Sequence, residues 1–201
     1  CITFTAKAKK EMFDKIYEMS HGKFSDADIM KIKIHTFHAF ANDYLTDAGL
    51  VSGEIVGNNF LRYSILQSFI DNKALTYGKS YIVQTIMPKV ETAIRYIKNF
   101  GITPDKIDLN KTAKAIEVLH KPTPAYSKAD MKAFLKYFVD AYKHYEDSKT
   151  DVIDYSDMLL TFIEKFQGEK YQHVLVDEMQ DMNEIEAQIV EMVSENLFLV
   201  G

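Results

Sequence analysis

The stretch VLVDEMQD, from Val174 to Asp181, decides how this chain is organised. Its first three residues are apolar, which is typical of a buried strand. Three carboxylates, Asp177, Glu178 and Asp181, then follow where the strand should end. Because ligands collect beyond the carboxyl ends of strands in a parallel α/β sheet, the stretch predicts a site at the edge of such a sheet. The alternative is that the acids only precede a capped helix.

The segments before and after this stretch alternate between strand and helix patterns. Near the N-terminus, residues 1–5 and 31–37 show strand patterns, and residues 6–19 and 38–45 show helical spacing of apolar residues. Later in the chain, the helical patterns cover residues 154–166 and 183–193, and the strand patterns cover residues 171–176 and 197–201. This alternation predicts an α/β layer with a parallel sheet, in which the last strand is buried.

The middle of the chain has a different pattern. Residues 58–148 show helical periodicity, with Pro88 as an expected kink. Turn-rich segments at Gly101–Asp105 and His120–Ser127 separate the helices. We therefore predict two domains: residues 1–50 and 150–201 form part of a parallel-sheet domain, and residues 51–149 form an all-helical insertion.

Composition excludes some classes of protein and leaves a polyanion as a possible partner. The net charge is -5, but residues 150–201 hold two lysines and 12 acidic residues, so the rest of the chain is net basic. No apolar run approaches the roughly 20 residues of a membrane-spanning helix. The N-terminus lacks the features of a signal peptide, and the one cysteine, Cys1, has no internal disulfide partner. We therefore expect a cytoplasmic protein with no membrane partner.

The acids at the end of the expected strand suit nucleotide chemistry. One carboxylate there can hold Mg²⁺, which bridges nucleotide phosphates. An adjacent carboxylate can accept a proton from an attacking water molecule. An apolar strand that ends in Asp-Glu is therefore the outline of a Walker B element, although capping residues give the same pattern.

Five motifs together resemble one family along the whole chain. In order, they are TFTAKAKKEM (Thr3–Met12), IHTFHAFANDYL (Ile34–Leu45), IDYSDMLL (Ile153–Leu160), VLVDEMQDMN (Val174–Asn183) and FLVG (Phe198–Gly201). This series resembles motifs Ia, Ib, II and the start of motif III in superfamily 1 DNA helicases of the UvrD/Rep/PcrA kind. The resemblance implies part of a RecA-like motor domain, called 1A, and the helical middle resembles its insertion domain 1B.

The resemblance implies roles for the acidic motif, with ATP and Mg²⁺ as cofactors of the full-length protein. Asp177 would bind Mg²⁺, and Glu178 would be the general base that polarises the hydrolytic water. Gln180 would lie near the γ-phosphate and couple hydrolysis to movement. Asp181 would support motif III.

The resemblance also implies a path for single-stranded DNA and for junctions between single and double strands. The residues along this path would be Phe4, Thr5, Lys7, Thr36, Phe37 and His38. Aromatic rings stack on bases, and hydroxyl and ammonium groups bind phosphates. Spacing alone favours core packing for Phe4 and Phe37. His35 and His38 are too weak a pattern to predict a metal site.

Some family features differ or are missing. Ala6, His35, Ala39 and Met182 stand where the family has other residues, which puts the DNA contacts near Ala6 and Ala39 in doubt. The chain has no G-x-x-x-x-G-K-[ST] loop, and its two arginines both lie in the expected insertion. We therefore predict that this polypeptide alone does not hydrolyse ATP.

Three functions remain open from the sequence. The first is an ATP-dependent DNA helicase or translocase, of 3′-to-5′ polarity by resemblance, in repair or replication. The second is the motor of an AddA- or RecB-like helicase–nuclease. The third, of a different class, is a non-catalytic DNA-binding or interaction module that keeps the motifs as relics.

Overall fold

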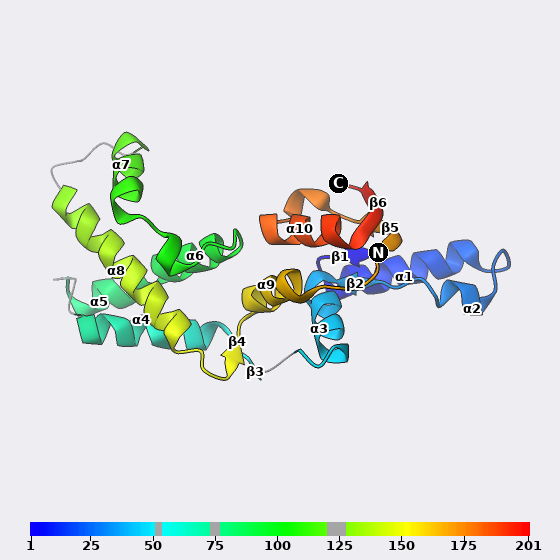
Figure 1. Cartoon of the computed structure of the whole chain (residues 1–201), viewed down its shortest axis with the longest axis horizontal. Coiled ribbons are helices and arrows are strands. Elements are labelled where there is room, and N and C mark those ends of the chain that lie inside the picture. The colour runs from blue at the N-terminus through cyan, green and yellow to red at the C-terminus, as the bar shows by residue number, and fades with distance from the viewer. Residues whose placement is uncertain (51–53, 73–76, 120–127) are drawn as a thin grey trace. The chain divides into compact units, whose positions relative to one another are not determined.

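The computed structural model describes residues 1–50, 54–72, 77–119 and 128–201 (Figure 1). The expected turn at His120–Ser127 lies outside these residues. The chain divides into two compact units, Cys1–Ser52 with Tyr155–Gly201 and Gly53–Asp154. Within the described residues, no helix is both long and apolar enough to cross a membrane.

The first unit contains a four-stranded sheet in which all pairs of neighbouring strands are parallel. In sheet order, the strands are β2 (His35–Thr36), β1 (Ile2–Thr3), β5 (Tyr171–Val176) and β6 (Ser194–Leu199). Ile2 pairs with Val176, so β5 lies between the first strand and the last strand of the chain. The predicted parallel α/β sheet is therefore present.

Five helices belong to this unit: α1 (Ala6–Ser20), α2 (Asp26–Ile29), α3 (Phe37–Asp47), α9 (Tyr155–Lys165) and α10 (Glu184–Val193). Parallel crossovers are right-handed, and β1–α1–β2 and β5–α10–β6 run toward opposite edges of the sheet. The two helices therefore cover opposite faces. Helix α9 contacts both α3 and α10, so these three share one face. Phe37, Leu45, Phe162, Val176 and Ile189 fill the core beneath them.

Two strands differ from the sequence prediction. In β5, Val174 and Val176 are buried, but Leu175 keeps 43% of its surface exposed. In β6, which was expected to be buried, Phe198 is 51% exposed. The reason is that β6 is an edge strand of the described sheet, and the contacts of α1 with the sheet are mainly with β1 and β2. Strand β2 is also shorter than predicted, because helix α3 begins at Phe37.

The second unit is mostly helical. Its elements are β3 (Glu54–Ile55), α4 (Asn58–Asn72), α5 (Lys79–Tyr81), η1 (Ile82–Ile86), α6 (Met87–Lys98), η2 (Pro104–Lys106), α7 (Leu109–Leu119), α8 (Lys128–Asp147) and β4 (Val152–Ile153). Side chains from α4, η1, α6 and α8 form one buried core, which includes Ile65, Ile82, Val90, Ile94, Tyr137 and Tyr142. Strands β3 and β4 pair in parallel, so the description of this region as all-helical was incomplete.

The expected irregularity at Pro88 is present just before that residue. The helical path changes at Ile82–Ile86, where η1 has π-helical geometry, and α6 starts at Met87. Proline has no N–H, and its ring clashes with the carbonyl four residues earlier. A π-turn before Pro88 moves the hydrogen bonds to more distant partners, which lets the two helical segments join without a break.

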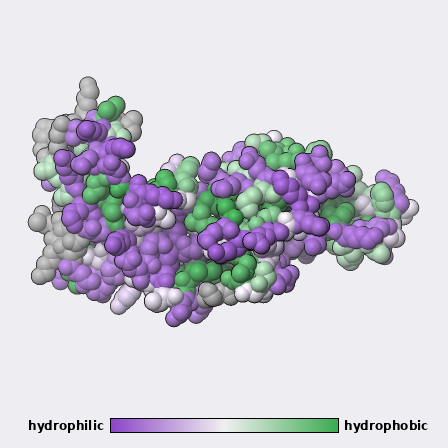
Figure 2. Space-filling view, viewed as in Figure 1, coloured by the Kyte–Doolittle hydropathy of each residue, from purple (hydrophilic) through white to green (hydrophobic). Residues whose placement is uncertain are grey.

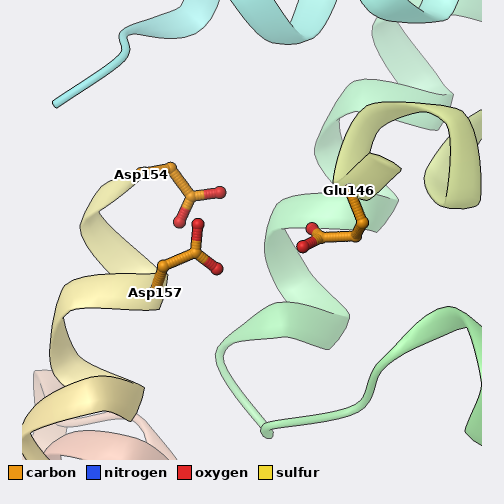
Figure 3. A group of neighbouring side chains, drawn as sticks. All are labelled: Glu146, Asp154 and Asp157. Atoms are coloured by element: carbon orange, nitrogen blue, oxygen red, sulfur yellow. The ribbon is translucent and has the colours of Figure 1, made fainter. Parts of the chain in front are cut away.

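Lys98 lies at the centre of a buried ionic cluster in this unit. Its side chain is 4% exposed, and its Nζ lies 2.8 Å from Glu146 Oε1 and 2.7 Å from Asp154 Oδ2. Figure 3 shows the carboxylates of these two acids and of Asp157, which lie close to one another. Lys149 contacts the same two acids, and the Tyr145 hydroxyl donates to Asp154. Burial alone would raise the pKa of Asp154, but the two ammonium groups outweigh it and hold that pKa well below its ordinary value. The cluster joins α6, α8 and the end of β4.

We expect Lys98→Met to lower the free energy of unfolding by about 3 kcal/mol, because it leaves buried carboxylates with one cation fewer. Since the folded-state pKa of Asp154 lies below its unfolded value, its stabilising contribution is complete above the unfolded pKa and disappears as pH falls through the folded pKa. The deficit of the variant should therefore shrink in acid. Urea unfolding between about pH 7 and pH 3 measures both effects.

Lys136→Met is the matched control, because Lys136 pairs with Asp140 on the surface of α8. An exposed pair of this kind contributes less than about 1 kcal/mol. Equal losses in the two variants would contradict the assignment of Lys98 as the anchor of the cluster.

Candidate functional site

The acidic motif lies at the carboxyl-terminal edge of the sheet, beside the end of the first strand. The Asp177 N–H donates to Ile2 O at 3.2 Å, directly after the pairing of Ile2 with Val176. On the other side, the Val200 N–H donates to Val176 O at 2.9 Å. The backbone at the start of the motif is therefore held between two neighbouring strands, at the carboxyl-terminal edge of the sheet.

Glu178 has an uncommon backbone conformation. Its φ is 56° and its ψ is 46°, which makes it the one non-glycine residue with positive φ in the described part of the chain. A left-handed backbone costs a residue with a Cβ about 1–2 kcal/mol. The turn that follows, η3 (Met179–Asp181), is closed by a hydrogen bond from the Asp181 N–H to Glu178 O at 3.0 Å. This bend leaves the Glu178 side chain exposed at the sheet edge.

Gln180 is held between Glu178 and the end of β6. Its Nε2 donates to a carboxylate oxygen of Glu178. A Cβ on Gly201 would lie 2.3 Å from Gln180 Oε1 and 2.9 Å from Met179 Cγ, so a larger residue there would move both side chains. Gly201 is not among the site residues that the sequence predicts. Its signal is a glycine after an apolar strand, which often marks close approach of another segment.

The acids do not cap the helix that follows them. Helix α10 is capped by Asn183, whose Oδ1 accepts the Glu186 N–H at 3.0 Å, while Glu186 accepts the Asn183 N–H at 3.0 Å. Burial raises the pKa of Glu186, and the hydrogen bond from the Asn183 backbone opposes this rise. Asp177 and Glu178 therefore precede a capped helix, as the alternative holds, but Asn183 and not these acids supplies the cap.

The two threonines predicted along the DNA path cap helices at the same edge. Thr5 Oγ1 accepts the Ala8 N–H at 3.1 Å at the start of α1. Thr36 Oγ1 accepts the Ala39 N–H at 3.3 Å at the start of α3. Both helices begin directly after strands β1 and β2, so their N-termini reach the edge that carries Asp177. Helix N-termini present N–H donors and a positive end of the dipole, which favours anions.

Phe4 and Phe37 contact each other but differ in exposure. Their ring centroids are 5.4 Å apart. Phe37 is 1% exposed and belongs to the core under α3, which supports the packing alternative for this residue. Phe4 is only partly buried and lies at the surface end of the pair. Of the two rings, Phe4 is the one that remains accessible to a ligand.

The remaining predicted residues are more loosely placed. Lys7 is 87% exposed in its side chain and lies 3.6 Å from Glu11. The His38 ring contacts the Tyr155 ring at 5.1 Å, and burial lowers the pKa of His38. In the ranges that the structure describes, the one group of potential metal-ligating side chains is Glu146, Asp154 and Asp157, which lies in the second unit.

His35 lies close to Asp43. Its Nδ1 lies 3.3 Å from Asp43 Oδ2 without hydrogen-bond geometry. Burial lowers the pKa of His35, and the nearby Lys9 lowers it further, while Asp43 acts in the opposite direction. We therefore assign His35 to the packing of the β2 edge.

The family follows from a comparison of the whole chain. Residues 1–201 match the UvrD/REP helicase N-terminal domain, and the chain belongs to this family. The chain is 26% identical to a probable DNA helicase II homolog of Mycoplasma genitalium. The alignment covers 100% of this chain and 28% of that relative. A second probable DNA helicase II homolog, from Mycoplasma pneumoniae, is also 26% identical and is covered to 27%. The chain therefore spans about a quarter of the length of these relatives.

We expect Glu178→Gly to be at least as stable as Glu178→Ala, because glycine relieves the left-handed strain that alanine keeps. Both variants lose the carboxylate, so the comparison isolates the backbone. The control is Glu11 in the interior of α1, where glycine should be about 1 kcal/mol less stable than alanine. Urea unfolding of the four variants measures the two differences. The same glycine penalty at both positions would contradict a strained Glu178.

Proposed function

We propose that this chain is part of the motor of an ATP-dependent DNA helicase or translocase. The observation that carries the proposal is the position of Asp177 and Glu178 at the end of an interior parallel strand, without a capping role. In this proposal, the first unit is part of the RecA-like domain 1A. The second unit, Gly53–Asp154, takes the place of the insertion domain 1B.

The donors of the acidic motif fit a magnesium nucleotide. Mg²⁺ prefers oxygen ligands and usually keeps several waters, and Asp177 offers a carboxylate at the strand end. Bound Mg²⁺ would neutralise the charge of the ATP phosphates. Glu178, which is exposed beside it, would accept the proton of the hydrolytic water. Gln180 is hydrogen-bonded to Glu178 and lies close to Gly201, so it would couple a change at the Glu178 carboxylate to the end of β6. Asp181 would support the same turn.

The missing phosphate-binding loop points to a further strand beside β6. The sequence has no G-x-x-x-x-G-K-[ST] motif, so we propose that this polypeptide alone does not turn over ATP. A parallel strand beyond β6, connected to β1, would need a right-handed crossover over the face opposite α10. Leu175 and Phe198, which are about half exposed there, would then be covered. The exposed edge and face of the sheet support this arrangement.

We propose single-stranded DNA, including single–double strand junctions, as the substrate. Phe4 offers an accessible ring, and the capped N-termini after Thr5 and Thr36 offer N–H groups to phosphates. Lys7 and His38 lie within the same two helices. We also propose 3′-to-5′ polarity and a role in repair or replication on the basis of the family resemblance. The single cysteine, Cys1, supports a cytoplasmic location.

We expect Glu178→Gln in the full-length protein to keep ATP and DNA binding and to lose DNA-stimulated ATP hydrolysis by at least about 100-fold, because general bases contribute 10²–10⁴-fold. Steady-state ATPase assays and nucleotide binding measure the two properties. Glu184→Gln, an exposed acid in the first turn of α10, is the control and should keep its activity. Wild-type turnover in Glu178→Gln would refute the assignment of the base.

We expect Phe4→Ala and Phe37→Ala to separate stacking from packing. Phe37→Ala should cost about 3–5 kcal/mol of unfolding free energy, because its ring is fully buried. Phe4→Ala should cost less stability but should weaken binding to a thymine oligonucleotide by about fivefold or more. Urea unfolding and fluorescence anisotropy test the two effects. If Phe4→Ala binds the oligonucleotide as the wild type does, Phe4 is only a packing residue.

A further inference from the structure

Helix α1 carries lysines and aromatic rings along one side. Lys9, Lys10, Phe13, Tyr17 and His21 recur at helical spacing over the helix and its C-cap. No residue of α1 is buried, although the helix is amphipathic. This row of residues is here called the α1 stripe; Lys9, Lys10, Tyr17 and His21 are exposed, and Phe13 is partly buried.

The N-terminal half of the stripe borders a pocket. The pocket encloses about 420 Å³ and is lined by Ala6, Lys9, Lys10, Phe13, Ile32 and Ile34. This volume lies within the range of small-molecule sites, and the lining combines apolar groups with two ammonium groups. An apolar floor with cations at its rim suits a flat ring that is linked to an anion.

The aromatic residues continue from this pocket along the helix. The rings of Phe13 and Tyr17 are stacked with centroids 6.3 Å apart, and the centroids of Tyr17 and His21 are 5.6 Å apart. Tyr17 is 37% exposed. Figure 2 shows hydrophobic and hydrophilic surface side by side over the end of the unit that holds α1 and α2. The stripe thus offers successive rings rather than one isolated aromatic residue.

The two lysines of the stripe differ from their neighbours in their partners. Lys7 contacts Glu11 and Lys31 contacts Asp28, but Lys9 and Lys10 form no ion pair with any residue that the structure describes. Both are exposed. Asp14 borders the stripe one turn after Lys10 without pairing with it. The positive charge at the pocket rim is therefore available to a ligand.

We propose that the α1 stripe binds single-stranded DNA, with a base against Phe13 and the adjacent phosphates on Lys9 and Lys10. The inference rests on the proposed function, because it takes DNA as the ligand. Helix α1 starts directly after Phe4 and Thr5, so the stripe extends the proposed DNA path by about 22 Å, the length of 15 helical residues. Lysines beside stacked rings are the combination that binds single strands without sequence preference.

The test measures binding of a thymine oligonucleotide to the full-length protein at several salt concentrations. Lys9→Ala with Lys10→Ala should reduce the magnitude of the slope of log affinity against log salt by about 1.4, which is two single-strand phosphate contacts. The control is Lys15→Ala with Lys170→Ala, which removes the same charge outside the stripe. Equal slopes in the two double variants would overturn the proposal.

Tyr17→Ala tests the rings separately, because Tyr17 is exposed enough to be replaced without loss of the fold. We expect binding to weaken about fivefold or more, with an unchanged thermal unfolding midpoint. An iodouracil-substituted oligonucleotide should also crosslink to Phe13, Tyr17 or His21 on irradiation. Crosslinks confined to other residues, with wild-type affinity in Tyr17→Ala, would overturn the proposed role of the rings.

The outcomes separate this proposal from the proposed function. If the full-length protein binds no single-stranded DNA, both ideas fail. If the protein binds DNA and the stripe variants behave as their controls do, the proposed function is supported and DNA binding by the α1 stripe is refuted.

Discussion

The structure of the first unit depends on the pairing of β1 with β5. The pairing is short and buried: Ile2 lies opposite Val176, and Thr3 is 1% exposed beside them. It joins two segments that are more than 170 residues apart in the chain. Because parallel strands end at the same edge, this one contact places the acidic turn beside the start of α1. Without it, Asp177 would have no fixed relation to Thr5.

The sequence predicted the elements better than it predicted their surroundings. Strand β5 occupies residues 171–176, as its apolar run indicated, because local pattern decides that a segment is a strand. The same pattern does not say how many neighbours the strand has. Leu175 and Phe198 are exposed because burial needs a covering layer, and the described residues place no helix there. The second unit comprises residues 53–154, whereas the helical and strand patterns predicted residues 51–149 for it.

In the candidate site, residue type alone does not predict the burial of Phe4 and Phe37. Phe4 and Phe37 both adjoin a threonine that caps a helix, and the sequence treated them alike. Phe4 precedes its cap, Thr5, whereas Phe37 follows its cap, Thr36, and is the first residue of a helix. Phe4 therefore lies outside its helix, whereas Phe37 is the first residue of α3 and packs into the core. The position relative to the cap does not decide burial by itself, because Ala6, the first residue of α1, is exposed.

The acidic turn is held from both sides, and this accounts for its strain. Asp177 donates to Ile2 O on the β1 side, and Met179 donates to Val200 O at 2.8 Å on the β6 side. Glu178, between them, has a left-handed backbone that an unrestrained turn would not keep. A displacement of either strand end must therefore change the conformation of Glu178. Gln180 is hydrogen-bonded to Glu178 and lies against the end of β6, so the Glu178 carboxylate is connected to the same strand end as its backbone.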